Sequence, residues 1–154
     1  MYYKAVALTA LCCAGTGMRP PLLGHLTALR CLTRLHLGGC DISNSDITQH
    51  IAAFTALQDL DLWGCTADDP SAHYLTTGIL PNLSKLSMAW SQVASALPLL
   101  PGLTYLDLSH CKLGGSFSDG EFAAAAEMQQ LRVVLLVQTE VDAMGCELLE
   151  TLLR

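Results

Sequence analysis

Hydrophobic residues recur along this chain in a frame of eleven positions. The clearest copy runs from Leu103 to Leu113, with leucine at its first, fourth, sixth and eleventh positions and cysteine at its ninth. Leucine occupies fifteen of the eighteen first, fourth and sixth positions, far more than its share of the chain would place there. Because successive side chains of a strand point to opposite faces, alternation over positions three to six predicts a short strand in each copy. The five further copies, spaced 20 to 28 residues apart, begin at Leu8, Leu32, Leu57, Leu83 and Leu131.

The segments between these strands predict short helices and turns. Asp69 followed by a proline favours a helix over 69–78, whereas prolines at 98 and 101 favour an extended or 3₁₀ crossing over 91–102. A helix is also expected over 120–130, behind Asp119. After the second strand, a cap among residues 44–46 and helical spacing predict a convex helix with Ile47, Ile51 and Phe54 on its inner side. A last helix, capped by Asp142, is expected to bury Cys146, Leu149, Leu152 and Leu153.

Units that each hold one strand and one return segment cannot bury their apolar face alone, so they are expected to stack on one another. The prediction is an α/β solenoid of about six repeats, with a curved parallel sheet on its concave side and short helices and loops on its convex side. A length of 154 residues and a hydrophobic content of 51% suit a single domain over residues 1–154.

Cysteine stands at the ninth position of three copies, at Cys40, Cys65 and Cys111. With these residues in place, units such as CDISNSDITQHIAAFTALQDLDLWGC resemble the cysteine-containing leucine-rich repeat family, known for example from the substrate-binding halves of F-box proteins. The resemblance implies the solenoid fold but no particular partner, because receptors, adaptors, phosphatase regulators and ciliary proteins share this frame. The chain departs from the family pattern at three ninth positions, Thr16, Ser91 and Thr139, and in one short unit of 20 residues. No segment resembles an F-box.

Charge and cysteine content narrow the classes of partner and compartment. The formal net charge is −6 and the eight basic residues form no cluster, which argues against nucleic acid as a ligand and against a polybasic membrane patch. No apolar run reaches the roughly 18 residues of a spanning helix, so no membrane insertion is expected. Seven cysteines, an odd number, favour an intracellular reducing compartment, in the cytoplasm or in an organelle- or cilium-associated assembly. Residues 1–17 also resemble a short secretory signal, but Leu8 stands where the repeat spacing requires a strand.

Residues between the leucines are expected to project from the concave face in columns whose neighbours are about 4.8 Å apart. Large aromatic side chains gather in the middle copies, at Trp63, Trp90, Tyr105 and His110. Such side chains dominate the energetics of protein interfaces, so this group is the predicted hot spot. The alternative is that the tryptophans pack locally over the strand ends. Charged residues of the same columns complete the predicted partner-binding surface, namely Arg34, Asp61, Lys85 and Asp107.

The third-position column alternates in charge, through Arg34, Asp59 and Lys85. One interpretation is a cross-strand ladder of opposite charges, worth a few tenths of a kcal/mol per pair. In the other interpretation these residues contact the partner.

The fifth-position column offers one catalytic alternative. Cys12, His36 and Asp61 follow one another in the order of nucleophile, base and orienting acid. Parallel strands hold such side chains side by side instead of letting them converge, so a cysteine hydrolase is a distant alternative and no catalysis is expected. No Cys or His spacing fits a zinc site, and neither a metal nor a cofactor is expected.

The last strand is apolar on both faces, because Val133, Leu135 and Val137 lie on the concave side. Repeat arrays normally end in polar caps, and none is evident. Either the chain is a section of a longer array, or partners cover its ends. The preferred hypothesis is a non-catalytic interaction module or scaffold subunit within a multi-subunit complex. The alternative is a regulatory or targeting adaptor, of the F-box-like or phosphatase-regulator kind.

Overall fold

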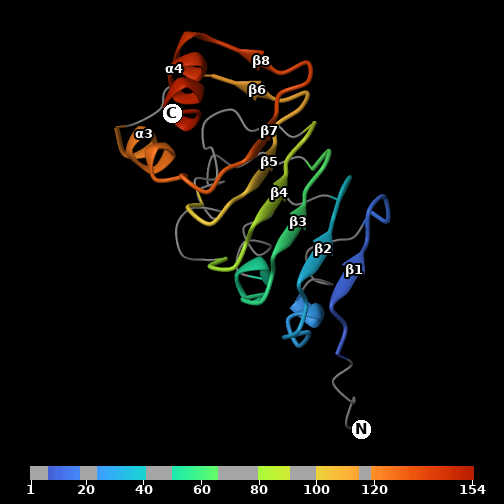
Figure 1. Cartoon of the computed structure of the whole chain (residues 1–154). Helices are drawn as coiled ribbons and strands as arrows, with labels where there is room; N and C mark the ends of the chain where they lie inside the picture. The colour runs from blue at the N-terminus through green and yellow to red at the C-terminus, as the bar shows by residue number, and fades with distance from the viewer. Residues whose placement is uncertain (1–6, 18–23, 41–49, 66–79, 91–99, 115–118) are drawn as a thin grey trace, which may run out of the picture.

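Six short parallel strands form one sheet in the order in which they occur along the chain. The computed structural model describes residues 7–17, 24–40, 50–65, 80–90, 100–114 and 119–154. Figure 1 shows the strands side by side from one end of the molecule to the other. They are β1 (Ala10–Cys12), β2 (Arg34–His36), β3 (Asp59–Asp61), β4 (Lys85–Ser87), β5 (Tyr105–Asp107) and β7 (Val133–Leu135).

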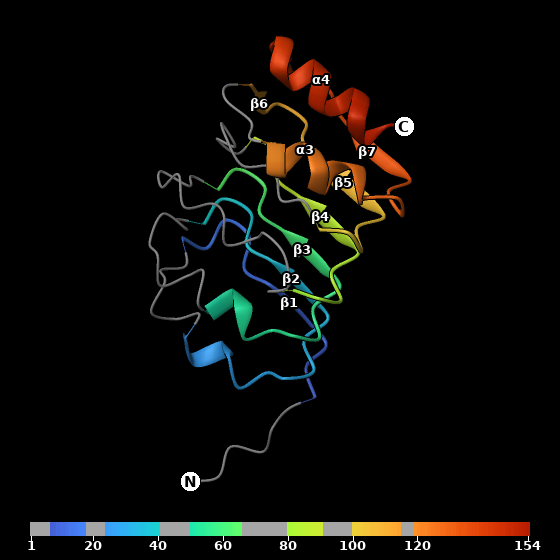
Figure 2. The ribbon, with the colours of Figure 1, turned by 90° about the vertical axis from the view of Figure 1, so that its left-hand side faces the viewer.

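Helical segments lie on one side of this sheet. Residues 24–26 and 50–52 are helical, and both lie on the same side of the strands as helix α3 (Asp119–Ala126) in Figures 1 and 2. A second parallel pair, β6 (Lys112–Leu113) with β8 (Glu140–Val141), precedes helix α4 (Ala143–Leu152). The predicted α/β solenoid is therefore confirmed.

The strands pair in the register that the repeat frame predicts. Arg34 lies opposite Asp59, and Asp59 opposite Lys85, so the third-position column is continuous. Leucines at the fourth position pair with one another across the same strands, and a slip by one residue would turn them all to the opposite face. Beyond each strand the sixth-position amide donates to the next repeat, as Leu62 N does to Ser87 O at 2.8 Å.

The core consists of the frame leucines together with apolar residues of the return segments. Ile51 and Phe54 are buried, as expected for the convex helix near residue 50. Fully buried frame residues include Leu32, Leu35, Leu37, Leu57, Leu60, Leu62, Leu86, Leu103, Leu106 and Leu108. The caps at 44–46, Ile47, the helix at 69–78 and most of the crossing at 91–102 lie outside the described residues.

The ninth-position side chains join successive repeats. The thiols of Cys40, Cys65 and Cys111 are buried and donate to the sixth-position carbonyl of the preceding repeat, at 3.4, 3.2 and 3.1 Å. The hydroxyl of Thr139 makes the same contact, to Leu108 O at 2.8 Å. Threonine therefore replaces cysteine here without loss of the hydrogen bond, which explains one departure from the family pattern; Ser91 lies outside the described residues.

Helix α4 begins as predicted and buries only part of the predicted stripe, since Leu152 is buried and Leu149 is partly buried against the core. The Asp142 carboxylate caps it, accepting a hydrogen bond from Gly145 N at 2.8 Å. Its buried residues are Gly145, Leu148 and Leu152, whereas Cys146 is exposed and Leu153 is 67% exposed. The predicted stripe was wrong at those two positions because a glycine faces the core: a Cβ on Gly145 would lie 2.5 Å from Leu113 O. Helix α3 begins at Asp119 as expected and ends at Ala126, short of residue 130.

Candidate protein-binding surface

The turn that follows each strand has the same left-handed residue at position eight. Only glycine adopts this conformation without steric cost, since other L-residues bring Cβ close to a carbonyl oxygen. In three repeats the residue is a glycine and in three it carries a side chain. These residues are Gly15, Gly39, Gly64, Trp90, His110 and Gln138, with φ of 67°, 69°, 62°, 61°, 59° and 53°.

Trp90 and His110 occupy this position in adjacent repeats, and their rings stack. The ring centroids are 4.0 Å apart and the planes meet at 17°. The two turns are also joined through the backbone, because Trp90 N donates to Ser109 O at 2.9 Å. Trp90 nevertheless remains 57% exposed. One face of its ring therefore packs against His110, and much of the remainder is open to solvent.

Trp63 lies one position earlier in its repeat, at position seven. Its amide donates to Asp61 Oδ1 at 2.9 Å, and its ring lies over Gly38 of the preceding repeat, where an added Cβ would be 3.4 Å from the ring atom Cε3. The side chain is 50% exposed. Gly64 N donates to Ala89 O at 2.7 Å, so Trp63 and Trp90 leave adjacent, hydrogen-bonded turns. Trp63 packs toward the preceding repeat and Trp90 toward the following one. Each ring is therefore packed locally on one side, as in one interpretation of the sequence, and exposed on another side, as a binding surface requires.

The fifth-position column holds two carboxylates in matching positions. Asp107 Oδ1 accepts a hydrogen bond from Ser109 N at 2.9 Å, as Asp61 Oδ1 does from Trp63 N. Tyr105, two residues before Asp107, is partly buried. Burial raises the pKa of the Tyr105 hydroxyl, and the nearby carboxylates of Asp107, Asp59 and Asp61 raise it further. The three carboxylates therefore act on the Tyr105 hydroxyl in the same direction as burial.

The predicted charge ladder does not form. Arg34, Asp59 and Lys85 are in register, but the structure records no ion pair within 4.0 Å that joins any two of them. Among the described residues, ion pairs join Lys112 to Glu140 at 3.3 Å and Arg154 to Glu150 at 3.8 Å. The side chains of Arg34 and Lys85 are exposed to solvent.

The proposed hydrolase residues share a column without forming a relay. Cys12, His36 and Asp61 lie on adjacent strands in register. No hydrogen bond among these three side chains is recorded, and the hydrogen bond recorded for the Asp61 carboxylate comes from the amide of Trp63. Within the described ranges, no three His, Cys, Asp or Glu residues group so as to hold a metal ion. Nor does this part of the chain contain a helix with the length and apolarity needed to span a bilayer.

The outer face of the last strand is apolar, as the sequence suggested. Val133 is 40% exposed, Val137 is 58% exposed and Leu135 is partly buried. Strand β7 is the last strand of the sheet, after β5. Each column of outward-facing residues therefore ends at its residue on β7.

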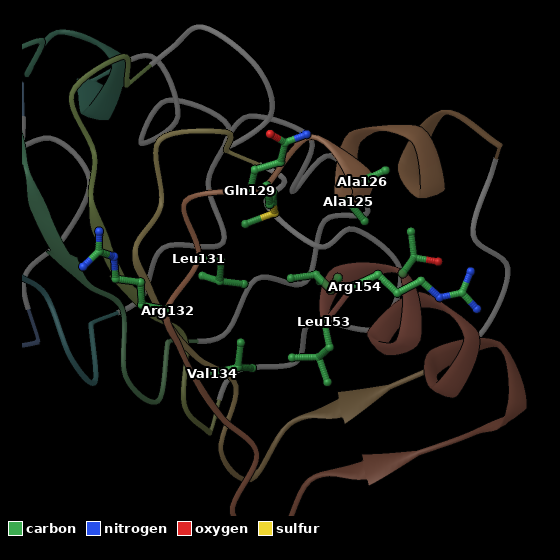
Figure 3. Close-up of a pocket in the computed structure, with 11 residues that line it drawn as sticks. Ala125, Ala126, Gln129, Leu131, Arg132, Val134, Leu153 and Arg154 are labelled. Atoms are coloured by element: carbon green, nitrogen blue, oxygen red, sulfur yellow. The ribbon is translucent and has the colours of Figure 1, made fainter.

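A groove beside β7 was not anticipated from the sequence. It lies between α3, β7 and α4, with a volume of about 360 Å³, and Figure 3 shows Leu131, Val134 and Leu153 around it. The sequence did not indicate this groove, because Leu153, which lines it, was expected to be buried beneath α4. We call Val133, Leu135, Val137 and this groove the end surface.

Comparison with known proteins supports the fold. Leucine-rich repeat family profiles match residues 28–48 and 102–121. Internalin C2 of Listeria monocytogenes is similar over 94% of this chain and 68% of its own, with 22% identity and a TM-score of 0.60. A leucine-rich repeat protein of Leptospira interrogans is similar over 84% of this chain and 43% of its own, with 14% identity and a TM-score of 0.51. No curated protein matches the sequence.

Proposed function

We propose that this chain, a leucine-rich repeat solenoid, binds a protein partner through the turns and sheet face of its middle repeats. The fold is one that serves protein interaction in general. The observation that carries the more specific proposal is the pair of half-exposed tryptophans on adjacent turns. Trp90 is held there in a backbone conformation that favours glycine. A bulky aromatic residue at such a position costs stability, and strain of this kind is concentrated at functional sites.

The energetic case rests on the area that these rings leave uncovered. A tryptophan in the centre of an interface is typically worth 2 kcal/mol or more on truncation to alanine, which is about 30-fold in affinity. The rings of Trp63 and Trp90 are already restrained by contacts with Gly38 and His110. A partner that covers them would therefore lose little side-chain entropy on binding.

The test is retention of partners by a Trp63→Ala, Trp90→Ala double variant. Immobilised wild type and variant are exposed to an extract of the source organism, and the bound proteins are quantified by mass spectrometry. At least one protein should be retained tenfold less by the double variant. The matched control is Trp63→Tyr with Trp90→Tyr, which keeps a ring at each site and should retain most of the binding. Unchanged retention of every protein would overturn the proposal, provided that far-UV circular dichroism shows the variant folded.

We further propose that the end surface provides a scaffold contact within a larger assembly. The exposed side chains of Val133 and Val137, together with the groove beside β7, support this second contact. Val137→Asp should remove a different set of retained proteins, or lower the mass measured by light scattering, while the tryptophan-dependent set remains. An adaptor would hold one partner at each of the two surfaces at the same time. A simple interaction module would retain the same proteins after Val137→Asp as the wild type does.

A reducing compartment is proposed on the state of the cysteines. All seven are free thiols, and the four at Cys13, Cys40, Cys65 and Cys111 are buried. Three of these thiols are hydrogen-bond donors between repeats. Alkylation of the unfolded protein, taken directly from cells, should modify all seven without prior reduction. Modification of fewer thiols would contradict the proposal.

A further inference from the structure

We infer that the partner places a cationic side chain, arginine or lysine, between Asp61 and Asp107 on the sheet face, next to the turns that carry Trp63 and Trp90. This inference rests on the proposed function and names the chemistry of the segment that would bind there. It depends on the charges of the fifth-position column, on the way its carboxylates are held, and on the aromatic rings next to them.

The two carboxylates flank a small polar residue. Asp61 on β3 and Asp107 on β5 are both in register with Ser87 on β4. Two strand spacings separate the aspartates, which is about 10 Å between their Cα atoms. All three side chains project from the same face of the sheet and are partly exposed. The space above Ser87 is therefore bordered by a carboxylate on each side.

Both carboxylates are held in place before any partner arrives. Oδ1 of each accepts a hydrogen bond from the amide two residues further on, at 2.9 Å in both cases. For these residues, no partner of the second oxygen is recorded. Each aspartate therefore keeps an acceptor for an incoming N–H group, and arginine carries five such donors in a planar arrangement. Because the acceptors are fixed, a cation would bind without the entropy cost of ordering them.

The surroundings favour positive charge. Carboxylates at Asp59, Asp61 and Asp107 act on the Tyr105 hydroxyl in the direction expected of a negative field. The basic residues Arg34 and Lys85 belong to the third-position column, and neither forms a recorded ion pair with these aspartates. With a net charge of −6, the whole chain also favours the approach of a basic segment.

The aromatic rings supply the second half of the recognition. Trp63 follows Asp61 by two residues and exposes half of its surface, and Trp90 exposes 57%. Tryptophan is the aromatic side chain that best attracts a cation to its face, and guanidinium groups also stack on it. An arginine in the space above Ser87 would therefore have carboxylates at its donors, and the segment that carries it would meet the exposed rings on the adjacent turns.

A displayed random peptide library, selected on the wild-type chain, tests this chemistry directly. Selected peptides should carry an arginine or lysine at one constant position. Replacing a selected arginine by citrulline, or a selected lysine by acetyl-lysine, removes the charge and should weaken binding about tenfold. Asp61→Asn and Asp107→Asn should each weaken binding about three- to fivefold, the range of a solvent-accessible ion pair. Asparagine can still accept the turn hydrogen bond, so the turns should persist.

Lys85→Gln serves as a control of opposite sign. Removing a positive charge near the site should strengthen binding of the same peptide about twofold, which a loss of folding would not produce. Peptides that require Trp63 and Trp90 but show no preference for a cation, or bind Asp61→Asn and Asp107→Asn as tightly as wild type, would overturn this inference and leave the proposed function intact. Failure to select any peptide that depends on the tryptophans would count against both.

Discussion

Comparing Trp90→Gly with Trp90→Ala measures what it costs to hold a bulky residue in the left-handed turn. Both variants remove the ring that stacks on His110. Only glycine also relieves the backbone, whose φ at this residue is 61°. The difference between the two free energies of unfolding therefore isolates the backbone contribution from the ring contact.

The expected difference follows from two opposing effects. A left-handed conformation costs an L-residue roughly 1–2 kcal/mol. Glycine avoids this cost, but it lowers the free energy of unfolding by about 0.5–1 kcal/mol relative to alanine, because it loses more conformational freedom on folding. Trp90→Gly should therefore be more stable than Trp90→Ala by about 0.5–1 kcal/mol. The stacked ring contributes about 0.5–1.5 kcal/mol, so Trp90→Ala should lie about 1 kcal/mol below wild type. Both variants should lose partner binding equally.

Urea unfolding followed by far-UV circular dichroism gives the measurement. With a denaturant slope of about 2 kcal/mol per molar, the two midpoints should differ by about 0.4 M. Gly64→Ala is the mirror-image control: φ is 62° and an added Cβ would approach no closer than 3.9 Å, to Gly39 N, so only the backbone resists it. This variant should lose about 0.5–1 kcal/mol. Equal midpoints for glycine and alanine at position 90, or an undiminished midpoint for Gly64→Ala, would refute the reasoning.

Three further predictions concern the supporting structure. Burial raises the pKa of the Cys65 thiol from 9.0 to about 11, so between these values only the unfolded chain ionises. Its contribution to stability is complete below pH 9 and is lost as the pH rises to 11, by up to roughly 3 kcal/mol. Wild type should lose more stability than Cys65→Ala over this range, and parallel curves would contradict this. Gly145→Ala should lower the free energy of unfolding by about 1–3 kcal/mol, because its added Cβ would overlap Leu113 O. The control is Gly102→Ala, whose added Cβ would make an ordinary contact at 3.4 Å and should change the unfolding midpoint little. Equal midpoints for the two variants would show that α4 packs elsewhere. Asp142→Ala should lower the free energy of unfolding by about 1 kcal/mol, because the helix cap is lost. Asp142→Asn should lower it much less, because asparagine can also cap, and thermal unfolding measures both. Equal losses for the two variants would assign the effect to the charge of Asp142 instead.

Some parts of the site were within reach of sequence reasoning. A strand alternates its side chains, so the leucine spacing places Asp61 and Asp107 in columns on one face of the sheet. The register shows that they share one column, with Ser87 between them. The cysteines at the ninth position occupy the same place in three copies of the frame, and all three are buried. These results follow from local geometry that repeats identically in every unit.

Other parts depend on contacts that no repeat frame encodes. Whether Arg34, Asp59 and Lys85 pair depends on side-chain rotamers, and they do not pair. A ring at position eight can point toward either neighbouring repeat, and the stacking of Trp90 on His110 decides the direction.

The order of leucines and cysteines along the chain determined the repeat, the strand register and the inward and outward faces, because each follows from a periodicity of backbone geometry. The face of α4 that is buried was decided only by the tertiary structure. Close packing there selects the residue with the smallest side chain, Gly145, over larger apolar residues nearby. Hydrophobic pattern counts apolar side chains, whereas docking of a helix on backbone depends on how closely two surfaces can approach. Leu153, the C-cap residue of α4, is 67% exposed and lines the groove beside β7, which the apolar pattern alone did not indicate.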